Sequence, residues 1–196
     1  MTYASRWIAA AALTALAAAG CQQDLNSRAW EMEQAAAQRS EVVGRPAPEF
    51  TLRNQDGQPT ALSDFRGRWV VLYFYPKDDT PGCACQATEF TELLTQFRDM
   101  NAVILGVSED PPASHRLFTE KYDLKLDLLS DPDHEVMRRY GAWVTSSLGD
   151  EQYGRVIRTT YIICPRGTIQ YHWPEVIPQG HAERVREKLA QLQQAS

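Results

Sequence analysis

The residues with the clearest chemistry are two cysteines, Cys83 and Cys85, near the start of a helix-like pattern. The segment YFYPKDDTPGCACQATEF passes from strand residues through turn residues to helix residues. Because Thr80, Pro81 and Gly82 precede the helical pattern, Cys83 falls in the first turn, where unpaired N–H groups and the helix dipole stabilise an anion. Since a cysteine is nucleophilic only as a thiolate, this position favours a reactive thiol over a small buried hydrophobe.

The pattern around this segment is typical of an α/β sheet with helices on both faces. The apolar run at 69–75 predicts a central buried strand, and NAVILGVS at 101–108 predicts a second one. The turn residues Asp56 and Gly57 predict an N-terminal β-hairpin. The remaining predicted elements are helices over about 83–99, 115–121, 134–141 and 181–194, and strands over about 126–130, 158–164 and 168–173.

One motif in the segment carries a family resemblance. Pro76-Lys-Asp-Asp-Thr80-Pro-Gly-Cys83 resembles the P-x-x-x-T-x-x-C signature of peroxiredoxins, and YPKDDTPGC is similar to the bacterioferritin comigratory protein, or PrxQ, subfamily. The likeness runs from Val42 to Leu192 and includes RTTYII at 158–163. It implies a thioredoxin-like fold of peroxiredoxin type, with a central mixed sheet, helices on both faces and an N-terminal β-hairpin. It also implies a thiol-dependent peroxidase that needs no cofactor and no metal.

The resemblance assigns roles to four residues. Cys83 would attack a hydroperoxide and become a sulfenic acid, releasing water or an alcohol. Thr80 would hydrogen-bond the peroxide, and Pro76 would shield the sulfur from water. Arg158 would keep Cys83 ionised and polarise the O–O bond. The chemistry needs such donors because negative charge moves onto the leaving oxygen, and an arginine stays cationic at any relevant pH.

The sequence departs from the family pattern where the sulfenic acid must be resolved. The family usually has a resolving cysteine five residues after the nucleophile, and this position holds Thr88. The family's usual glutamate three residues after the nucleophile is replaced by Gln86. Cys85 points about 200° away from Cys83 on a helix, so a disulfide between them would require the first turn to unwind. The alternatives are a one-cysteine cycle with an external thiol, which we favour, or resolution by Cys85, by Cys164 or by a cysteine of another subunit. Cys164 also replaces an aspartate that is usual in the family.

The N-terminus predicts export. Residues 1–20 contain one basic residue followed by an apolar run that is too short for a comfortable membrane span, which is typical of a signal peptide. The sequence LAAAGC ending at Cys21 resembles a bacterial lipobox, which implies acylation of Cys21 and a lipid anchor in the membrane. Gln22 resembles an outer-membrane rather than an inner-membrane sorting residue. We therefore expect a periplasm-facing envelope protein, or otherwise a periplasmic one.

The predicted organisation is a signal peptide at 1–20, a tether at 21–41 and one catalytic domain at 42–194. The chain has 196 residues, of which 43% are hydrophobic, enough for one core. A net charge of -5 without a basic cluster gives no indication of nucleic acid binding. The expected partners are a hydroperoxide and an external thiol reductant, either a thioredoxin-like protein or a small thiol. The resemblance is compatible with a monomer or a homodimer.

Two other functions compete. A thioredoxin-like disulfide oxidoreductase would need C-x-x-C, and C-A-C at 83–85 is one residue short. A metal carrier or redox sensor could use Cys83 and Cys85 as soft ligands. Trp143 and Tyr153 are expected in a loop before Arg158, either at the substrate entrance or packed on the core. The four histidines, expected at the surface or at helix ends, are His115, His134, His172 and His181.

Overall fold

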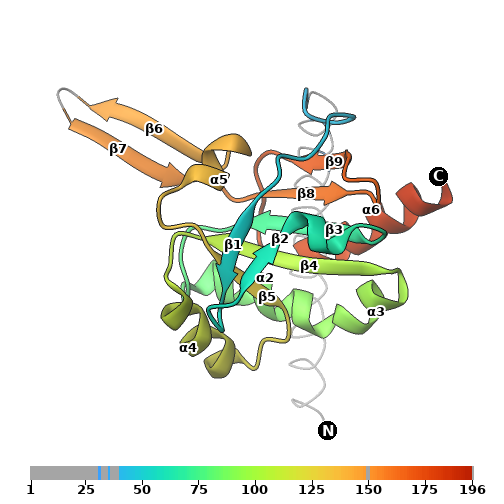
Figure 1. Cartoon of the computed structure of the whole chain (residues 1–196), viewed down its shortest axis with the longest axis horizontal. Helices are drawn as coiled ribbons and strands as arrows, with labels where there is room; N and C mark the ends of the chain where they lie inside the picture. The colour runs from blue at the N-terminus through green and yellow to red at the C-terminus, as the bar shows by residue number, and fades with distance from the viewer. Residues whose placement is uncertain (1–30, 32–34, 36–39, 149–150, 196) are drawn as a thin grey trace, which may run out of the picture.

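The computed structural model of the chain describes residues 31, 35, 40–148 and 151–195 (Figure 1). The predicted signal peptide at 1–20, the predicted acylation site Cys21 and most of the predicted tether lie outside these residues. Among the described residues, none of the helices has the length and apolar character that crossing a membrane requires.

The centre of the molecule is a mixed β-sheet. In the described part of the chain it has seven strands in the order β2-β1-β5-β4-β3-β8-β9. β3 pairs in parallel with β4, and β4 with β5, while the other pairings are antiparallel. The strands are β1 (Thr51–Asn54), β2 (Pro59–Ala61), β3 (Trp69–Phe74), β4 (Ala102–Ser108), β5 (Asp127–Ser130), β8 (Thr159–Ile163) and β9 (Ile169–Trp173).

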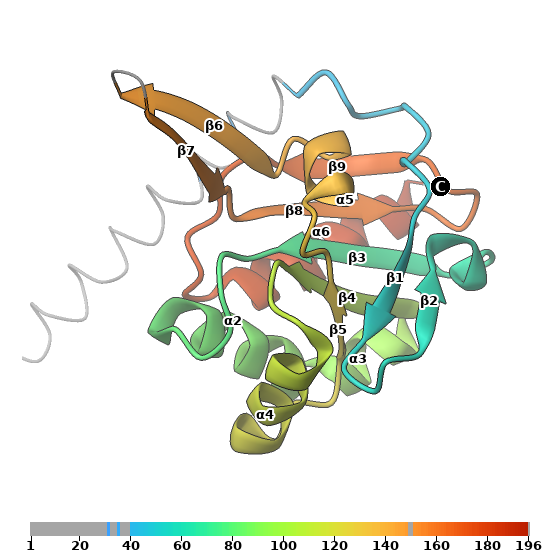
Figure 2. The same ribbon diagram turned by 60° about the vertical axis from the view of Figure 1, so that its left-hand side comes forward.

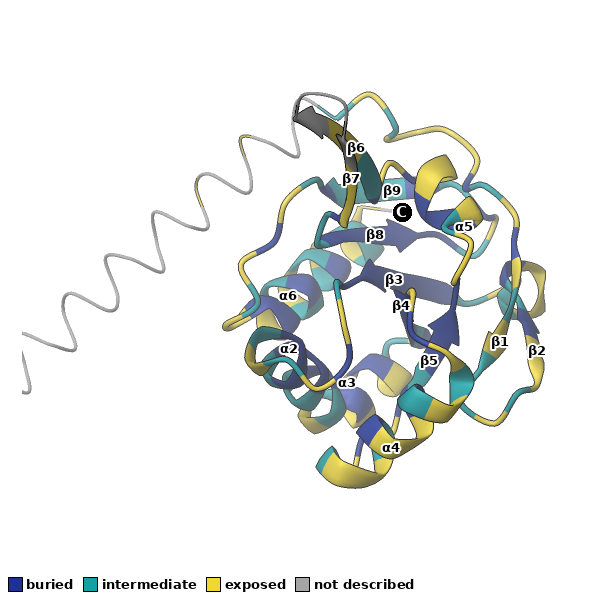
Figure 3. Cartoon of the chain, turned by 90° about the vertical axis from the view of Figure 1, so that its left-hand side faces the viewer, coloured by how far each residue is buried: buried dark blue, intermediate teal, exposed yellow. Residues whose placement is uncertain are grey.

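Helices cover both faces of this sheet, so the predicted thioredoxin-like architecture is confirmed (Figure 3). α2, α3, α4 and α6 bury apolar side chains on one face, against alternate residues of β3 such as Val71 and Tyr73. α5 and the 3-10 helix η1 pack on the other face, against Val70 and Leu72. The helices are η1 (Leu62–Phe65), α2 (Pro81–Glu92), α3 (Leu94–Asp99), α4 (Pro112–Tyr122), α5 (Glu135–Arg139) and α6 (His181–Gln194).

The middle strand β3 explains why the site is built where it is. All six of its residues are buried, because β4 and β8 flank it and helices cover both sides. A strand covered on both faces needs a continuous apolar run, and WVVLYF provides one. The chain leaves β3 at Tyr75 and enters α2 six residues later, so the carboxyl end of the central strand presents the Pro76–Thr80 loop.

The N-terminal hairpin follows the predicted turn. β1 and β2 pair antiparallel around Asp56 and Gly57, and Gly57 has a φ of +75° that favours glycine. The Asn54 side-chain oxygen accepts hydrogen bonds from the backbone N–H groups of Asp56 (3.0 Å) and Gln58 (2.9 Å). This Asx geometry stabilises the turn and aligns the two strands.

Two predicted elements are wrong. The single helix expected over 83–99 is two helices, α2 and α3, which meet at Leu93. The loop expected before Arg158 is instead a second hairpin of β6 (Trp143–Leu148) and β7 (Glu151–Val156), which extends away from the main sheet (Figure 2). The alternation of apolar and polar residues in this hairpin is weak, so its sequence gives little indication of strands.

The aromatic residues of this second hairpin have different surroundings. Trp143 stacks on His134 with ring centroids 3.6 Å apart and packs against the apolar cluster on the face opposite Cys83. A Cβ on Gly154 would lie 1.9 Å from the Trp143 ring, so this position accepts only glycine in the present arrangement. Tyr153 is 52% exposed. Packing is therefore the correct interpretation for Trp143.

Candidate active site

Cys83 is the third residue of α2, and its side chain is 2% exposed. The helix begins with Pro81, whose missing N–H and restricted φ suit a first helical position. Thr80 is the N-cap residue, with an extended backbone, and its carbonyl accepts the first helical bond from Ala84 N–H (2.9 Å). The sulfur thus lies in the first turn of the helix, at the positive end of its dipole.

The Thr80 side chain faces the loop rather than capping α2. Its Oγ1 donates to the Lys77 carbonyl at 3.1 Å, so the hydroxyl proton is held by the loop and the oxygen lone pairs remain as acceptors. Pro76 is half-buried and directly follows Tyr75 at the end of β3. Both predicted residues therefore lie on the segment that leads from β3 to Cys83.

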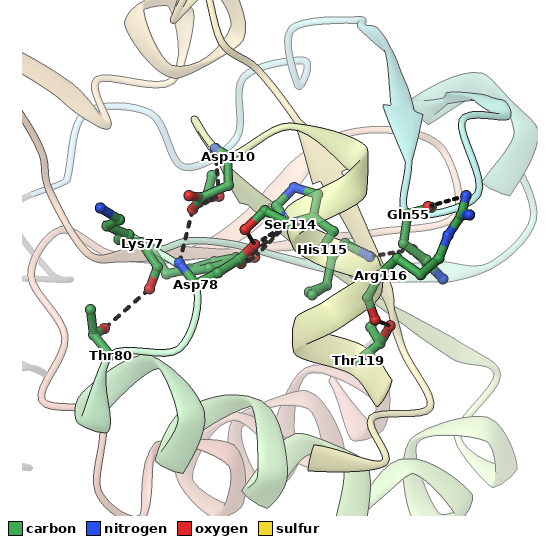
Figure 4. A network of polar contacts seen from close by, with 12 residues as sticks. Gln55, Lys77, Asp78, Thr80, Asp110, Ser114, His115, Arg116 and Thr119 are labelled. Atoms are coloured by element: carbon green, nitrogen blue, oxygen red, sulfur yellow. Dashed lines mark hydrogen bonds and ion pairs between the residues drawn. The ribbon is translucent and has the colours of Figure 1, made fainter. Parts of the chain in front are cut away.

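A buried polar network holds this loop in place, as Figure 4 shows. The Asp78 carboxylate accepts hydrogen bonds from Tyr75 Oη (2.7 Å) and Ser114 Oγ (2.7 Å), and pairs with His115 Nδ1 (2.9 Å). The backbone N–H of Asp78 donates to Asp110 Oδ2 at 2.8 Å. One carboxylate therefore ties the loop before Cys83 both to the end of β3 and to α4.

The network keeps Asp78 ionised. Burial by itself acts to raise the pKa of Asp78. The hydrogen bond and charge of His115, together with the hydrogen bonds from Ser114 and Tyr75, outweigh burial and lower the pKa. Burial, with smaller contributions from Tyr73 and Asp78, raises the pKa of Tyr75, which stays a neutral donor. An ionised acceptor makes these hydrogen bonds stronger than neutral ones.

Two of the histidines expected at the surface or at helix ends, His115 and His181, have fully buried side chains. The helix-end position expected for His181 is confirmed, since it begins α6, and its ring lies inside the core against Phe90 and Trp173. Burial lowers the pKa of His181, which keeps the ring neutral.

Arg158 contacts Cys83 directly, although the two residues are 75 positions apart. Its Nη2 lies 3.2 Å from the Cys83 sulfur, and its Nη1 donates to Gln86 Oε1 at 2.6 Å. Arg158 immediately precedes β8, and its carbonyl accepts a hydrogen bond from Val176 N–H at 3.0 Å. Pairing of β8 with β3 therefore brings the arginine to the start of α2.

A second segment approaches the same turn. A Cβ placed on Gly82 would lie 3.3 Å from Pro178 Cγ and 3.5 Å from Arg158 Nη2. The residue before Cys83 must therefore be small for the loop before α6 to pack this closely. Pro178 is not among the predicted site residues, because nothing in its local sequence indicates where the loop folds.

Cys85 has different surroundings from Cys83. Its half-buried thiol donates to Glu89 Oε1 at 3.5 Å, and the same oxygen accepts a hydrogen bond from Gly180 N–H at 2.8 Å. Burial, and then the negative charge and hydrogen bond of Glu89, raise the pKa of Cys85. The thiol is therefore a poor nucleophile as it stands, because little of it is ionised.

Cys164 is distant from the site along its strand. It follows β8 directly, is 6% exposed and packs in the apolar cluster. Arg158 and Cys164 stand at opposite ends of β8, about 20 Å apart at the usual strand rise. All three cysteines in the described ranges are free. The same ranges contain no group of three or more His, Cys, Asp or Glu side chains arranged to hold a metal.

Comparisons with known proteins identify the family. The sequence model of the AhpC/TSA family matches residues 43–172. A putative peroxiredoxin bcp of Coxiella burnetii is 41% identical over 143 residues, which cover 73% of this chain and 95% of that protein. Peroxiredoxin Bcp of Bacillus subtilis is 33% identical over 150 residues, covering 76% and 96% of the two chains.

Solved structures give the same result. A structure of the bacterioferritin comigratory protein of Xanthomonas campestris is 34% identical and superposes with a TM-score of 0.69, covering 72% of this chain and 90% of that one. A structure of peroxiredoxin Q from the same organism has the same TM-score, at 35% identity, with coverage of 72% and 89%. The chain therefore belongs to the AhpC/TSA family, in the Bcp or peroxiredoxin Q subfamily, and is a thiol-dependent peroxidase.

Proposed function

We propose that Cys83 is the peroxidatic cysteine and that Arg158 is its electrostatic partner. The thiolate attacks one oxygen of a hydroperoxide, an S–O bond forms and the O–O bond breaks. The sulfur is oxidised to a sulfenic acid, and the departing oxygen takes up a proton to leave as water or an alcohol. The observation that carries the proposal is the 3.2 Å contact from Arg158 Nη2 to the Cys83 sulfur at a helix N-terminus.

The neighbouring residues have separate roles in this proposal. Arg158 stabilises the thiolate and then the charge that develops on the departing oxygen, because a fixed cation in a desolvated site needs no reorganisation. Thr80 accepts a hydrogen bond from the peroxide O–H through its oxygen lone pairs, while its own hydroxyl donates a hydrogen bond to the Lys77 carbonyl. Pro76 closes the loop side of the site and limits access of water.

The substrates we propose are hydrogen peroxide and organic hydroperoxides. The bacterioferritin comigratory protein of Xanthomonas campestris has alkyl peroxide reduction activity. In the present chain, the neighbourhood of Cys83 offers apolar as well as polar contacts, since Pro178 packs over Gly82 and the adjacent Ile177 is 48% exposed. Such a rim suits an alkyl substituent better than a purely polar one would.

We propose a one-cysteine cycle in which an external thiol resolves the sulfenic acid. The external sulfur attacks the oxidised Cys83, a mixed disulfide forms and water leaves; a second thiol then reduces the disulfide. Three observations support this cycle over an internal resolver. Cys85 is bonded to Glu89, its pKa is raised, and Cys164 lies at the far end of β8.

Mass spectrometry of the intact protein after one equivalent of peroxide tests both proposals. The wild-type protein should gain one oxygen, and trapping with dimedone should label Cys83 in the wild type and in Cys85→Ser and Cys164→Ser. An intramolecular disulfide that disappears only in Cys85→Ser would show that Cys85 is the resolver. Undiminished peroxide consumption by Cys83→Ser would show that the nucleophile lies elsewhere.

We also propose that the protein is exported and anchored by lipid at Cys21, facing the periplasm at the outer membrane. The signal-like segment at 1–20 and the lipobox-like residues before Cys21 support this location. In the expressing bacterium, a labelled fatty acid should be incorporated into the wild type and not into Cys21→Ser. If both proteins carry the label equally, Cys21 is not the acylated residue.

A further inference from the structure

We propose that a recess on the sheet face opposite Cys83 binds a small carboxylate that has an apolar body. The recess has a volume of about 200 Å³ and lies between the segment 42–48, the end of α5, β8 and β9. Figure 2 shows this segment, in blue, passing β9 on its way to β1. The volume is below the roughly 300–1,000 Å³ of sites for drug-sized ligands, so the ligand must be small.

The floor of the recess is apolar. It is formed by Tyr140, Tyr161 and Ile169, which are all buried and belong to the apolar cluster on the face opposite Cys83. The two tyrosine rings meet edge to face, with centroids 5.1 Å apart. Their hydroxyls are used elsewhere, because Tyr140 Oη donates to the Pro48 carbonyl at 2.8 Å and Tyr161 Oη donates to the Tyr140 carbonyl. The floor therefore offers a ligand the carbon surface of the rings.

The walls of the recess are already in place. Gly44 N–H donates to the Ile169 carbonyl at 2.8 Å, and Ile169 N–H donates to the Arg45 carbonyl at 3.0 Å, so the segment is paired with β9. On the other side, Arg139 Nη1 donates to the Glu49 carbonyl at 2.6 Å and joins α5 to the same stretch of chain. A preformed site loses little free energy in ordering its walls when a ligand binds.

Two exposed guanidinium groups line the recess, those of Arg45 and Arg139. Within the part of the chain that the structure describes, neither forms an ion pair with a carboxylate. Arg139 donates to the backbone carbonyls of Glu49 and Glu135, and the Glu49 carboxylate is bonded to Arg66 instead. The recess thus holds two uncompensated cations, although the chain has a net charge of -5.

The combination of floor and charge determines the class of ligand. A guanidinium group binds a carboxylate through charge-assisted hydrogen bonds, and its planar fork fits the two oxygens. Inorganic phosphate would satisfy the two cations but would leave the apolar floor uncovered. A neutral aromatic compound would cover the floor but would leave the cations unpaired. A monocarboxylate with a ring or a short branched chain satisfies both.

The test is an NMR titration of the full chain with benzoate as the probe. Benzyl alcohol carries a similar ring without the charge, and inorganic phosphate carries charge without an apolar body. The titrations are repeated with Arg45→Gln and Arg139→Gln, which remove one cation each. The control variant is Arg53→Gln, which removes an exposed arginine of β1 that does not line the recess.

Benzoate should cause saturable shifts of the amide signals of Tyr140, Tyr161 and Ile169. Benzyl alcohol and phosphate should each bind at least about fivefold more weakly. Higher ionic strength should weaken the binding of benzoate, because the cations are exposed. Cys83→Ser should bind benzoate as the wild type does, so a failure of the proposed peroxidase assignment leaves this result unchanged.

The two arginine variants should each weaken the binding of benzoate about fivefold, and Arg53→Gln should match the wild type. Affinities that are equal in the wild type, Arg45→Gln and Arg139→Gln would overturn the inference. If Arg139→Gln does not fold, because its bond to the Glu49 carbonyl is lost, Arg45→Gln decides by the same criterion.

Three further results would also reject the proposed site. The first is the absence of saturable shifts with benzoate up to about 50 mM. The second is a set of shifts centred away from the recess. The third is binding of phosphate or benzyl alcohol as tight as that of benzoate, since the ligand would then not need both a carboxylate and an apolar body.

Discussion

The two flanks of α2 give neighbouring cysteines opposite surroundings. On one flank, Cys83 is buried and contacts the guanidinium group of Arg158, which also donates a hydrogen bond to the neutral amide of Gln86. On the other, Cys85 is half-buried and donates to the carboxylate of Glu89. One flank faces a cation and the other a carboxylate, although a single residue separates the two cysteines. In the function proposed above, the groups brought in by β8 and by the next helical turn, rather than proximity along the chain, decide which sulfur reacts.

Removing each sulfur in turn tests this contrast most severely. Cys83→Ser should lose all peroxide reduction above the uncatalysed rate, because a serine hydroxyl is not ionised at neutral pH and is a weak nucleophile. Cys85→Ser should keep nearly the full rate of the first oxidation. Stopped-flow measurement of peroxide consumption in a single turnover checks both, and equal losses in the two variants would erase the distinction between the flanks.

Removing the cation should affect mainly the Cys83 flank, although the charge of Arg158 also acts to lower the pKa of Cys85. Arg158→Ala should slow oxidation of Cys83 by about a hundredfold, the usual cost of losing one preorganised donor from a desolvated site. Arg158→Lys should recover part of the rate, since a lysine keeps the charge but cannot contact sulfur and Gln86 together. The measurement is the second-order rate constant with hydrogen peroxide, and a rate for Arg158→Ala within about threefold of the wild type would contradict the assignment.

The loop network that leads to the Cys83 flank offers a test of stability. Asp78→Asn should lower the free energy of unfolding by about 1–3 kcal/mol, because Tyr75, Ser114 and His115 lose an ionised acceptor. The pKa of Asp78 is lowered on folding, so its contribution is present above about pH 4 and is lost as the pH falls through the lower folded value. Urea denaturation at neutral and acidic pH checks this: the difference between wild type and variant should narrow in acid. A constant difference would mean that ionisation of Asp78 is not involved.

The mildest change is expected on the Cys85 flank. Glu89→Gln should lower the pKa of Cys85, because the carboxylate charge and its hydrogen bond both favour the protonated thiol. Alkylation of Cys85 at neutral pH should then be about two- to fivefold faster, as followed by peptide mass spectrometry. Alkylation of Cys164 in the same sample is the control. An unchanged rate at Cys85 would show that burial by itself keeps this thiol unreactive.

Much of the architecture could be predicted because its causes are local. The apolar run of β3 and the Asp56–Gly57 turn each specify their element through nearest neighbours in the chain. The break at Leu93 and the β6–β7 hairpin could not be predicted in this way, since the helical periodicity continues through the first and strand alternation is weak in the second. His115 was misplaced because a histidine becomes a core residue only when a partner such as Asp78 is folded against it.

The nucleophile candidate could be identified from the sequence alone, since a threonine, a proline and a glycine before a helical pattern place Cys83 in a first turn whatever the rest of the chain does. The family resemblance also assigned Arg158 to the same site. The contacts of each thiol, in contrast, depend on the folded chain. Pairing of β3 with β8 brings Arg158 to the oxygen of Gln86 on α2, and contacts with α4 fix the carboxylate of Asp78. Such long-range contacts have no signature in local spacing.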